Sequence, residues 1–130
     1  LVKIIKMSKS IQKSILLIES DDAILNSLQE KLKLAGYLII SAKDGFEGYE
    51  RVKSDKPSLI ISELTLPIMS GSKVARLLKF DERYKEIPFI LIGSENALSK
   101  VDKDEYSIDR VLTKPFRLGD LKDMIEVLLG

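Results

Sequence analysis

An apolar run that stops at a carboxylate constrains this chain most. Residues 59–61 read Leu-Ile-Ile, then Ser62 and Glu63 follow, and Pro67 forces a turn shortly afterwards. A strand buried on both faces of a parallel sheet is an almost continuous run of large apolar residues, because helices cover both sides of the sheet. Such a strand presents chemical groups only at its carboxyl end. Glu63 is therefore the first candidate functional residue.

Four other short apolar runs alternate with segments of helical periodicity. They cover residues 15–18, 37–42, 89–92 and 110–112. This alternation predicts an α/β fold, a doubly wound five-stranded parallel sheet with helices on both faces. The predicted inward positions of the helices are Ile24, Leu25, Leu28, Leu32 and Ala35, then Phe46, Tyr49 and Val52, then Val74, Leu77 and Leu78, and finally Leu118, Leu121, Ile125, Leu128 and Leu129.

Local signals mark where the helices begin and end. Ser20, Asp21 and Asp22 are candidate N-caps of the first helix, whose C-terminal stop is Gly36. Asp44 and Glu47 resemble a capping box. Residues 94–108 give the weakest helical pattern, and we expect this segment to be shortened, irregular or mobile.

Residues 1–14 form a lysine-rich lead-in, expected to be poorly ordered, and the folded domain is predicted over 15–130. The triplet at 7–9, Met-Ser-Lys, resembles a translation start, so the residues before it would derive from upstream sequence. We expect either a stand-alone domain or a fragment of a larger regulator.

Composition excludes several kinds of chemistry. The chain has no Cys and no His, which removes thiol chemistry and the commonest general base and metal ligand. Lys+Arg 21 against Asp+Glu 20 gives a net charge of +1, too small to indicate direct nucleic-acid binding. No apolar run is long enough to cross a membrane or to act as a signal peptide, so we expect a cytoplasmic protein that does not bind membranes.

The strand-acid-helix opening, the 57–67 stretch with the following Gly71, and Lys114-Pro115-Phe116 together resemble the response-regulator receiver domain of two-component signalling. The resemblance implies a flavodoxin-like sheet of order 2-1-3-4-5 and a cis Lys114–Pro115 peptide. It also implies a site in which an acid pair and an Asp hold Mg²⁺. The Asp accepts a phosphoryl group from a histidine kinase, a Ser or Thr and a Lys grip that group, and an aromatic residue reports it.

This sequence departs from that pattern at nearly every reactive position. The acid pair falls on Glu19 and Ser20, and a register slip to Asp21 and Asp22 would shorten the helix that ends at Gly36. The remaining equivalents are Glu63 for the acceptor, Thr65 as a further metal-site position, Gly93 with Ser94 adjacent for the hydroxyl grip, Val111 for the aromatic reporter and the unchanged Lys114.

Two functional hypotheses follow from these departures. The first is a degenerate receiver, not an enzyme, that acts as a phosphorylation-independent signalling or protein-interaction module. It would bind a kinase or an effector protein and need no cofactor, with Mg²⁺ binding weak or lost. In it, Glu63 would form a standing ion pair with Lys114 that imitates the charge of a phosphorylated Asp. The alternative is an active receiver that accepts a phosphoryl group on Glu63. A flavin-type cofactor binder is a third interpretation, disfavoured because no phosphate-binding loop follows a strand.

Overall fold

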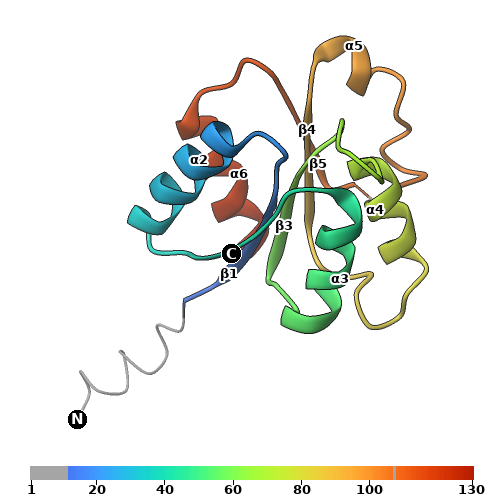
Figure 1. Cartoon of the computed structure of the whole chain (residues 1–130), viewed down its shortest axis with the longest axis horizontal. Coiled ribbons are helices and arrows are strands. Elements are labelled where there is room, and N and C mark those ends of the chain that lie inside the picture. The colour runs from blue at the N-terminus through green and yellow to red at the C-terminus, as the bar shows by residue number, and fades with distance from the viewer. Residues whose placement is uncertain (1–11, 107) are drawn as a thin grey trace.

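The computed structural model describes residues 12–106 and 108–130, where a parallel sheet lies between two layers of helices (Figure 1). The five-stranded sheet has the order β2-β1-β3-β4-β5, as predicted. Its elements in chain order are β1 (Ser14–Ile18), α2 (Asp22–Leu34), β2 (Leu38–Ala42), α3 (Gly45–Asp55), β3 (Leu59–Glu63), α4 (Gly71–Lys79), β4 (Phe89–Gly93), α5 (Glu95–Leu98), β5 (Arg110–Thr113) and α6 (Leu118–Leu129).

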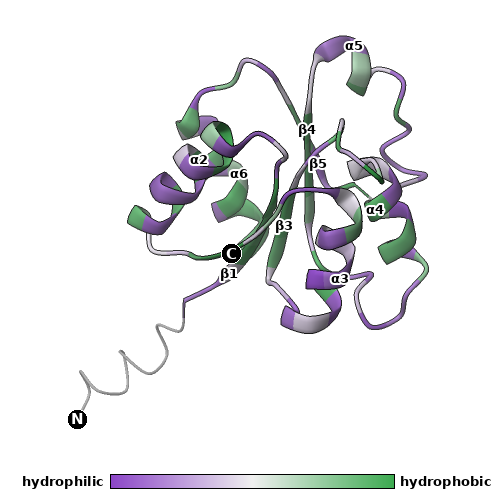
Figure 2. Ribbon diagram, viewed as in Figure 1, coloured by the Kyte–Doolittle hydropathy of each residue, from purple (hydrophilic) through white to green (hydrophobic). Residues whose placement is uncertain are grey.

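The core is divided by the sheet into two apolar clusters. Successive strand residues point to opposite faces, so Ile15 and Leu17 belong to one cluster while Leu16 and Ile18 belong to the other. Helices α2 and α6 cover the first face, and α3 and α4 cover the second (Figure 1). Figure 2 shows the consequence: the central strands are hydrophobic along their length, whereas the helices carry hydrophilic residues on their outer sides.

The helix boundaries follow the predicted capping residues. Asp21 caps α2 by accepting a hydrogen bond from the N–H of Ile24 (3.0 Å). Asp44 caps α3 through the N–H of Glu47 (2.8 Å). Gly36, with φ of +103°, lies just beyond the C-terminal end of α2, where a side chain would be strained.

Four predicted inward positions are wrong. Phe46 is 51% exposed and Leu77 is 36% exposed, and Ile24 and Ala35 also lie at the surface. In α3 the buried face consists instead of Gly45, Gly48 and Val52, because backbone and side chains of neighbouring segments approach the two glycines closely.

The segment from 94 to 108 is shortened, as predicted. Its only helix among the described residues is α5, with four residues, and turns follow it. Ile108 is buried, and the Asp109 carboxylate accepts a hydrogen bond from the N–H of Phe89 (2.8 Å). These two contacts anchor the end of the segment to the sheet before β5 begins.

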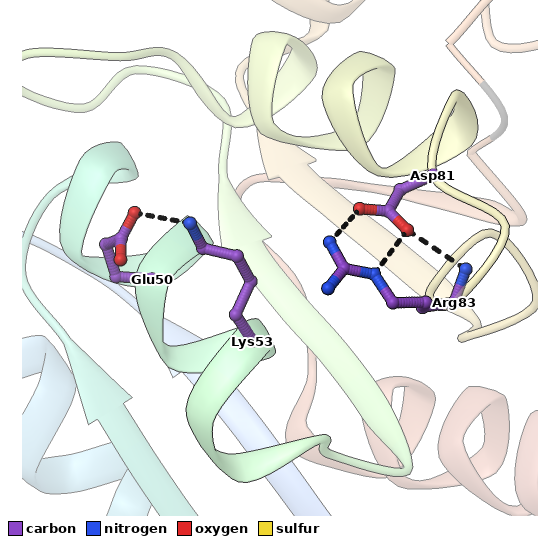
Figure 3. A network of polar contacts seen from close by, with 4 residues as sticks. All are labelled: Glu50, Lys53, Asp81 and Arg83. Atoms are coloured by element: carbon purple, nitrogen blue, oxygen red, sulfur yellow. Dashed lines mark hydrogen bonds and ion pairs between the residues drawn. The ribbon is translucent and has the colours of Figure 1, made fainter.

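Paired charged side chains lie on the outer side of α3 and in the turn that follows α4. Lys53 pairs with Glu50 on α3, and Asp81 accepts hydrogen bonds from both the backbone and the guanidinium of Arg83 (Figure 3). Tyr84, in the same turn, is buried. Within the described residues, no helix is both long enough and apolar enough to span a membrane.

Candidate functional site

Three polar residues follow strands at the same edge of the sheet. Glu19 comes directly after β1, Glu63 ends β3 and Lys114 comes directly after β5. The carboxyl ends of parallel strands meet at one edge. The N–H of Lys114 bonds to the carbonyl of Gly93 (2.9 Å), so the β4–β5 pairing continues past the strand and fixes the start of the lysine side chain. The Lys114–Pro115 peptide is cis, as the resemblance implied.

The backbone at Glu63 is enclosed by the loop that follows it. The hydroxyl of Ser62 donates a hydrogen bond to the Glu63 carbonyl (2.8 Å), and Gly71 returns to bond Leu64 through its N–H (2.9 Å). A Cβ at Gly71 would lie 2.1 Å from the Glu63 carbonyl oxygen. Glycine is therefore required there, and the loop holds the end of β3 in a fixed position.

Glu63 and Lys114 form a direct ion pair across the end of the sheet. The ammonium of Lys114 donates a hydrogen bond to Oε1 of Glu63. The Glu63 side chain is 11% exposed and that of Lys114 is 37% exposed. The other carboxylate oxygen, Oε2, is buried, and no group in the described part of the chain donates a hydrogen bond to it. One oxygen of the carboxylate is thus paired and the other is an unused acceptor.

The surroundings of Glu63 oppose its ionisation. Its pKa is raised above the ordinary value of 4.5, chiefly because burial disfavours the charged form. The hydrogen bond and the charge of Lys114 act to lower this pKa, and the negative charge of Glu19 acts to raise it. Burial raises the pKa of Glu63 by more than Lys114 lowers it. Keeping the Glu63 carboxylate ionised in this position therefore costs free energy of folding.

Of the acidic residues after β1, only Glu19 belongs to the site. Glu19 is 5% exposed, and its Oε2 accepts a hydrogen bond from the N–H of Asp21 (3.1 Å). Ser20 is exposed and has no carboxylate. Asp21 caps α2, and the exposed Asp22 pairs with Lys43 at the surface. The alternative register, with Asp21 and Asp22 as the acid pair, therefore has no geometric support.

Within the described part of the chain, the other predicted site positions do not place a polar side chain beside Glu63 and Lys114 in a hydrogen bond or ion pair. Gly93 is buried and has no side chain, and the hydroxyl of Ser94 is occupied as the N-cap of α5, where it accepts from the N–H of Ala97 (3.1 Å). Thr65 is exposed in the turn after β3. Val111 is 38% exposed on the edge strand β5.

One residue beside the site was missed by the sequence reasoning. Ile68 has φ of +70° and is 80% exposed, between Pro67 and the loop return at Gly71. A β-branched residue in the left-handed region is an outlier. The turn signal at Pro67 was visible in the sequence, but nothing local showed which residue after it takes a positive φ.

Comparison with known sequences and structures gives the class of protein to which this fold belongs. A sequence model described as the response regulator receiver domain matches residues 15–126, and the chain belongs to this family. It is 34% identical over 117 residues to the response regulator receiver protein CpdR of Brucella abortus, covering 90% of this chain and 97% of that protein.

Longer relatives and solved structures agree with this assignment. The chain is 29% identical over 117 residues to the alkaline phosphatase synthesis transcriptional regulatory protein PhoP of Bacillus subtilis, covering 90% of this chain but 48% of that protein. It thus spans about half the length of several relatives. The response regulator TrrA of Thermotoga maritima, solved in complex with Mg²⁺-BeF, is 27% identical with a TM-score of 0.81, covering 91% of this chain and all of that one. Chemotaxis regulator CheY4 of Vibrio cholerae, at 23% identity and TM-score 0.83 over 91% and 99% of the two chains, shares the fold.

The donor set at this edge does not match a standing Mg²⁺ site. Mg²⁺ requires a nearly octahedral set of oxygens at short distances. Within residues 12–106 and 108–130 no group of three or more Asp, Glu, His or Cys side chains gathers to hold a metal. Glu19 and Glu63 supply two carboxylates, and the ammonium of Lys114 already neutralises one of them. Oε2 of Glu63 has no hydrogen-bond donor among the described residues, so this atom still offers an oxygen ligand.

Proposed function

We propose that this receiver domain is a signalling and protein-interaction module that works without phosphorylation of an aspartate. The observation that carries the proposal is the direct Lys114–Glu63 ion pair. In a working receiver the lysine grips the incoming phosphoryl group. Here the lysine is already bound to the residue at the acceptor position, and the longer glutamate side chain provides the negative charge in place of a phosphoryl group.

The other equivalents support the same proposal. Phosphoryl transfer depends on positioned charges that stabilise the transferring group. Gly93 offers no hydroxyl, and the Ser94 hydroxyl is engaged by the N–H of Ala97. Val111 has no aromatic ring with which to report that the site is filled. A displacement of about 1 Å can lower a rate about a hundredfold, and the additional methylene of Glu63 moves its oxygens by roughly that distance.

Mg²⁺ is expected to bind weakly or not at all. Glu19 and Glu63 are the residues that would hold the ion, with Ser20 and Thr65 at the remaining family positions. Neither Ser20 nor Thr65 carries a carboxylate, and both are exposed. The ion would also have to compete with the ammonium of Lys114 for Glu63.

The partners expected for such a module are proteins. Two-component regulators communicate with histidine kinases and effectors, and we propose a partner of this kind in the cytoplasm. The net charge of +1 gives no reason to expect nucleic-acid contact by this domain itself.

A second candidate function is an active receiver that uses Glu63 as acceptor. The buried Oε2 favours it, because no hydrogen-bond donor of the described residues occupies that oxygen. With phosphoramidate as donor, the carboxylate oxygen would form a bond to phosphorus while the P–N bond breaks. The departing nitrogen would leave as ammonia after protonation, and an acyl phosphate would remain on Glu63.

Intact-mass measurement distinguishes the two functions. The protein is incubated with phosphoramidate or acetyl phosphate in the presence of Mg²⁺ and compared with Glu63→Gln and with the surface control Glu95→Gln. We expect no phosphoryl adduct in any of the three. An adduct that is present in the parent and in Glu95→Gln but absent in Glu63→Gln would overturn the proposal and establish the active receiver.

A gain-of-function variant shows that the assay can detect phosphorylation on this scaffold. Glu63→Asp combined with Ser20→Asp restores the acceptor and the second acid of the family pattern. Because this variant can bind Mg²⁺ with three carboxylates, an adduct is expected with it. An adduct in the double variant and none in the parent would locate the loss of activity at these two positions.

A further inference from the structure

The outer face of α4 lines a cavity that the site described above does not use. The cavity has a volume of about 570 Å³ and is bounded by α4 and by the segment leading into β5. This volume falls within the range of about 300–1,000 Å³ that is common for binding pockets. Its lining residues are Ser70, Ser72, Lys73, Arg76, Leu77, Phe80 and Tyr106, which we call the α4 groove.

Helix α4 carries two residue stripes with the same spacing. Gly71, Val74, Ala75 and Leu78 are buried against the sheet. Lys73, Arg76, Leu77 and Phe80 repeat the spacing of three, four and seven residues on the outer side, and all four are exposed. Residues three and four apart are neighbours on a helix surface. The outer stripe is therefore a continuous surface. Lys73 lies near the start of α4, Arg76 and Leu77 lie towards its C-terminal end, and Phe80 is its C-cap.

The opposite wall of the groove is held by α4 itself. The ammonium of Lys79 donates hydrogen bonds to the carbonyls of Asp104 (3.2 Å) and Glu105 (2.8 Å). These contacts fasten the 102–106 segment beside α4, where Figure 1 shows it running from α5 towards β5. Tyr106, partly buried, packs against the core at this point and faces the groove.

The apolar end of the groove remains open. Phe80 is 75% exposed and Leu77 is 36% exposed. Contiguous exposed apolar patches with a polar rim are typical of interaction sites, and both of these side chains line the groove.

The positive charges of Lys73 and Arg76 favour a negatively charged partner in the groove. Lys73 and Arg76 take part in none of the ion pairs formed within the described residues. The first turn of a helix also favours negative charge, and Lys73 and the hydroxyls of Ser70 and Ser72 lie at this end of α4. Residues 1–11 of this chain contain lysines and no acidic residue, so their charge does not complement the groove.

We infer that the α4 groove binds an acidic amphipathic helix of a partner protein. Carboxylates of that helix would lie over Lys73 and Arg76, and its bulky apolar residues would pack on Leu77, Phe80 and Tyr106. In helix-in-groove binding, the bound helix presents its apolar anchors at spacings of three, four and seven residues. The inference deepens the proposed interaction module by giving it a surface. Glu63 is not among the residues that line the groove, so the inference stands whether or not Glu63 accepts a phosphoryl group.

The test uses two synthetic helical peptides with the same leucine stripe, one bearing glutamates and the other lysines at the flanking positions. Each is titrated into the ¹⁵N-labelled full chain. We expect the acidic peptide to shift the amide signals of 70–80 and 106, with at least tenfold weaker binding of the basic peptide. Equal binding of both peptides, no binding, or shifts centred on another surface would overturn the inference.

Variants separate the groove from the rest of the molecule. Lys73→Glu with Arg76→Glu, and separately Phe80→Ala, should each weaken binding of the acidic peptide at least tenfold. The control Lys33→Glu, an exposed lysine on α2, should leave binding unchanged. Wild-type affinity in the double variant would contradict the inference. Concentration-dependent dimerisation through Phe80 would contradict it as well, because the groove would then be occupied by a second copy of the chain. Peptide binding tests the groove, whereas the phosphoryl adduct tests the proposed function, so failure of the one and failure of the other give different results.

Discussion

The ammonium of Lys114 bonds to the carboxylate of Glu63 although the two residues are 51 positions apart in the chain. They meet because β3 and β5 both flank β4 and end at the same edge of the sheet. The pair lies at the carboxyl edge of the parallel sheet, where strand ends present chemical groups. The carboxylate of Glu63 is mostly buried. The free energy of unfolding of the protein should therefore depend on pH through the titration of this group.

Glu63 should make the fold less stable as the pH rises from acid towards neutral. Its pKa in the folded protein is raised above 4.5, whereas the unfolded chain has the ordinary value. Between these two values the folded state binds more protons than the unfolded state, so the free energy of unfolding falls as pH increases. The contribution is fully present below 4.5 and is lost as pH rises through the folded pKa.

The measurement compares urea unfolding of the parent and Glu63→Gln at several pH values from 4.5 to 8. The variant lacks the titrating group, and Lys114 is exposed enough to be hydrated without its partner. We expect the parent to gain stability relative to the variant as the pH is lowered. A relative loss on acidification would show that the ion pair, and not burial, determines the pKa of Glu63.

Ile68→Gly should stabilise the protein by about 1 kcal/mol. The left-handed conformation costs an L-residue about 1–2 kcal/mol, and the greater entropy of glycine in the unfolded chain cancels about 0.5–1 kcal/mol of that gain. The side chain is 80% exposed, so little packing is lost. Thermal unfolding should show an increase in Tm of about 3–5 °C.

The control for this variant is Leu34→Gly. Leu34 is 83% exposed, like Ile68, but lies in the last turn of α2 without a positive φ. Glycine should therefore destabilise the protein there, by about 0.5–1 kcal/mol. Destabilisation by Ile68→Gly to the same extent would mean that Ile68 is not strained.

Gly45→Ala should destabilise the protein by about 1–3 kcal/mol or more, the usual cost of overpacking. An added Cβ would lie 1.9 Å from the carbonyl oxygen of Met69, and backbone cannot move aside as a flexible side chain can. Gly119→Ala in α6 is the matched control, since nothing lies within 4 Å of its added Cβ. That variant should be neutral or slightly stabilising in chemical denaturation, and equal loss in both would exclude the steric explanation.

Hydrogen exchange should be fast in residues 99–106 and slow in β4. The segment follows a helix of only four residues and contains turns in place of a regular ladder of hydrogen bonds. The β4 amides serve as the internal reference, because all of β4 is buried. Protection of 99–106 comparable to that of β4 would mean that the segment is as stable as the sheet.

The sequence by itself determined the elements and most of their boundaries. Apolar runs such as 59–61 have no alternative to burial between two helical layers, and capping residues such as Asp21 and Asp44 act on the N–H groups of their own helix. The candidate residues Glu19, Glu63 and Lys114 were also recognisable, because each directly follows a predicted strand.

Only the tertiary structure decided which helix face is buried and how the site residues are paired. Periodicity allowed Phe46 to point inward, but the close approach of Met69 to Gly45 and of Ile18 to Gly48 turns the glycine face of α3 to the sheet. In α4, the face that is buried carries Val74, Ala75 and Leu78 and leaves Leu77 outside. Likewise, the free Oε2 of Glu63 depends on groups brought together by chain segments far apart in the sequence. Local sequence patterns report contacts within one element, whereas burial and pairing depend on distances between elements.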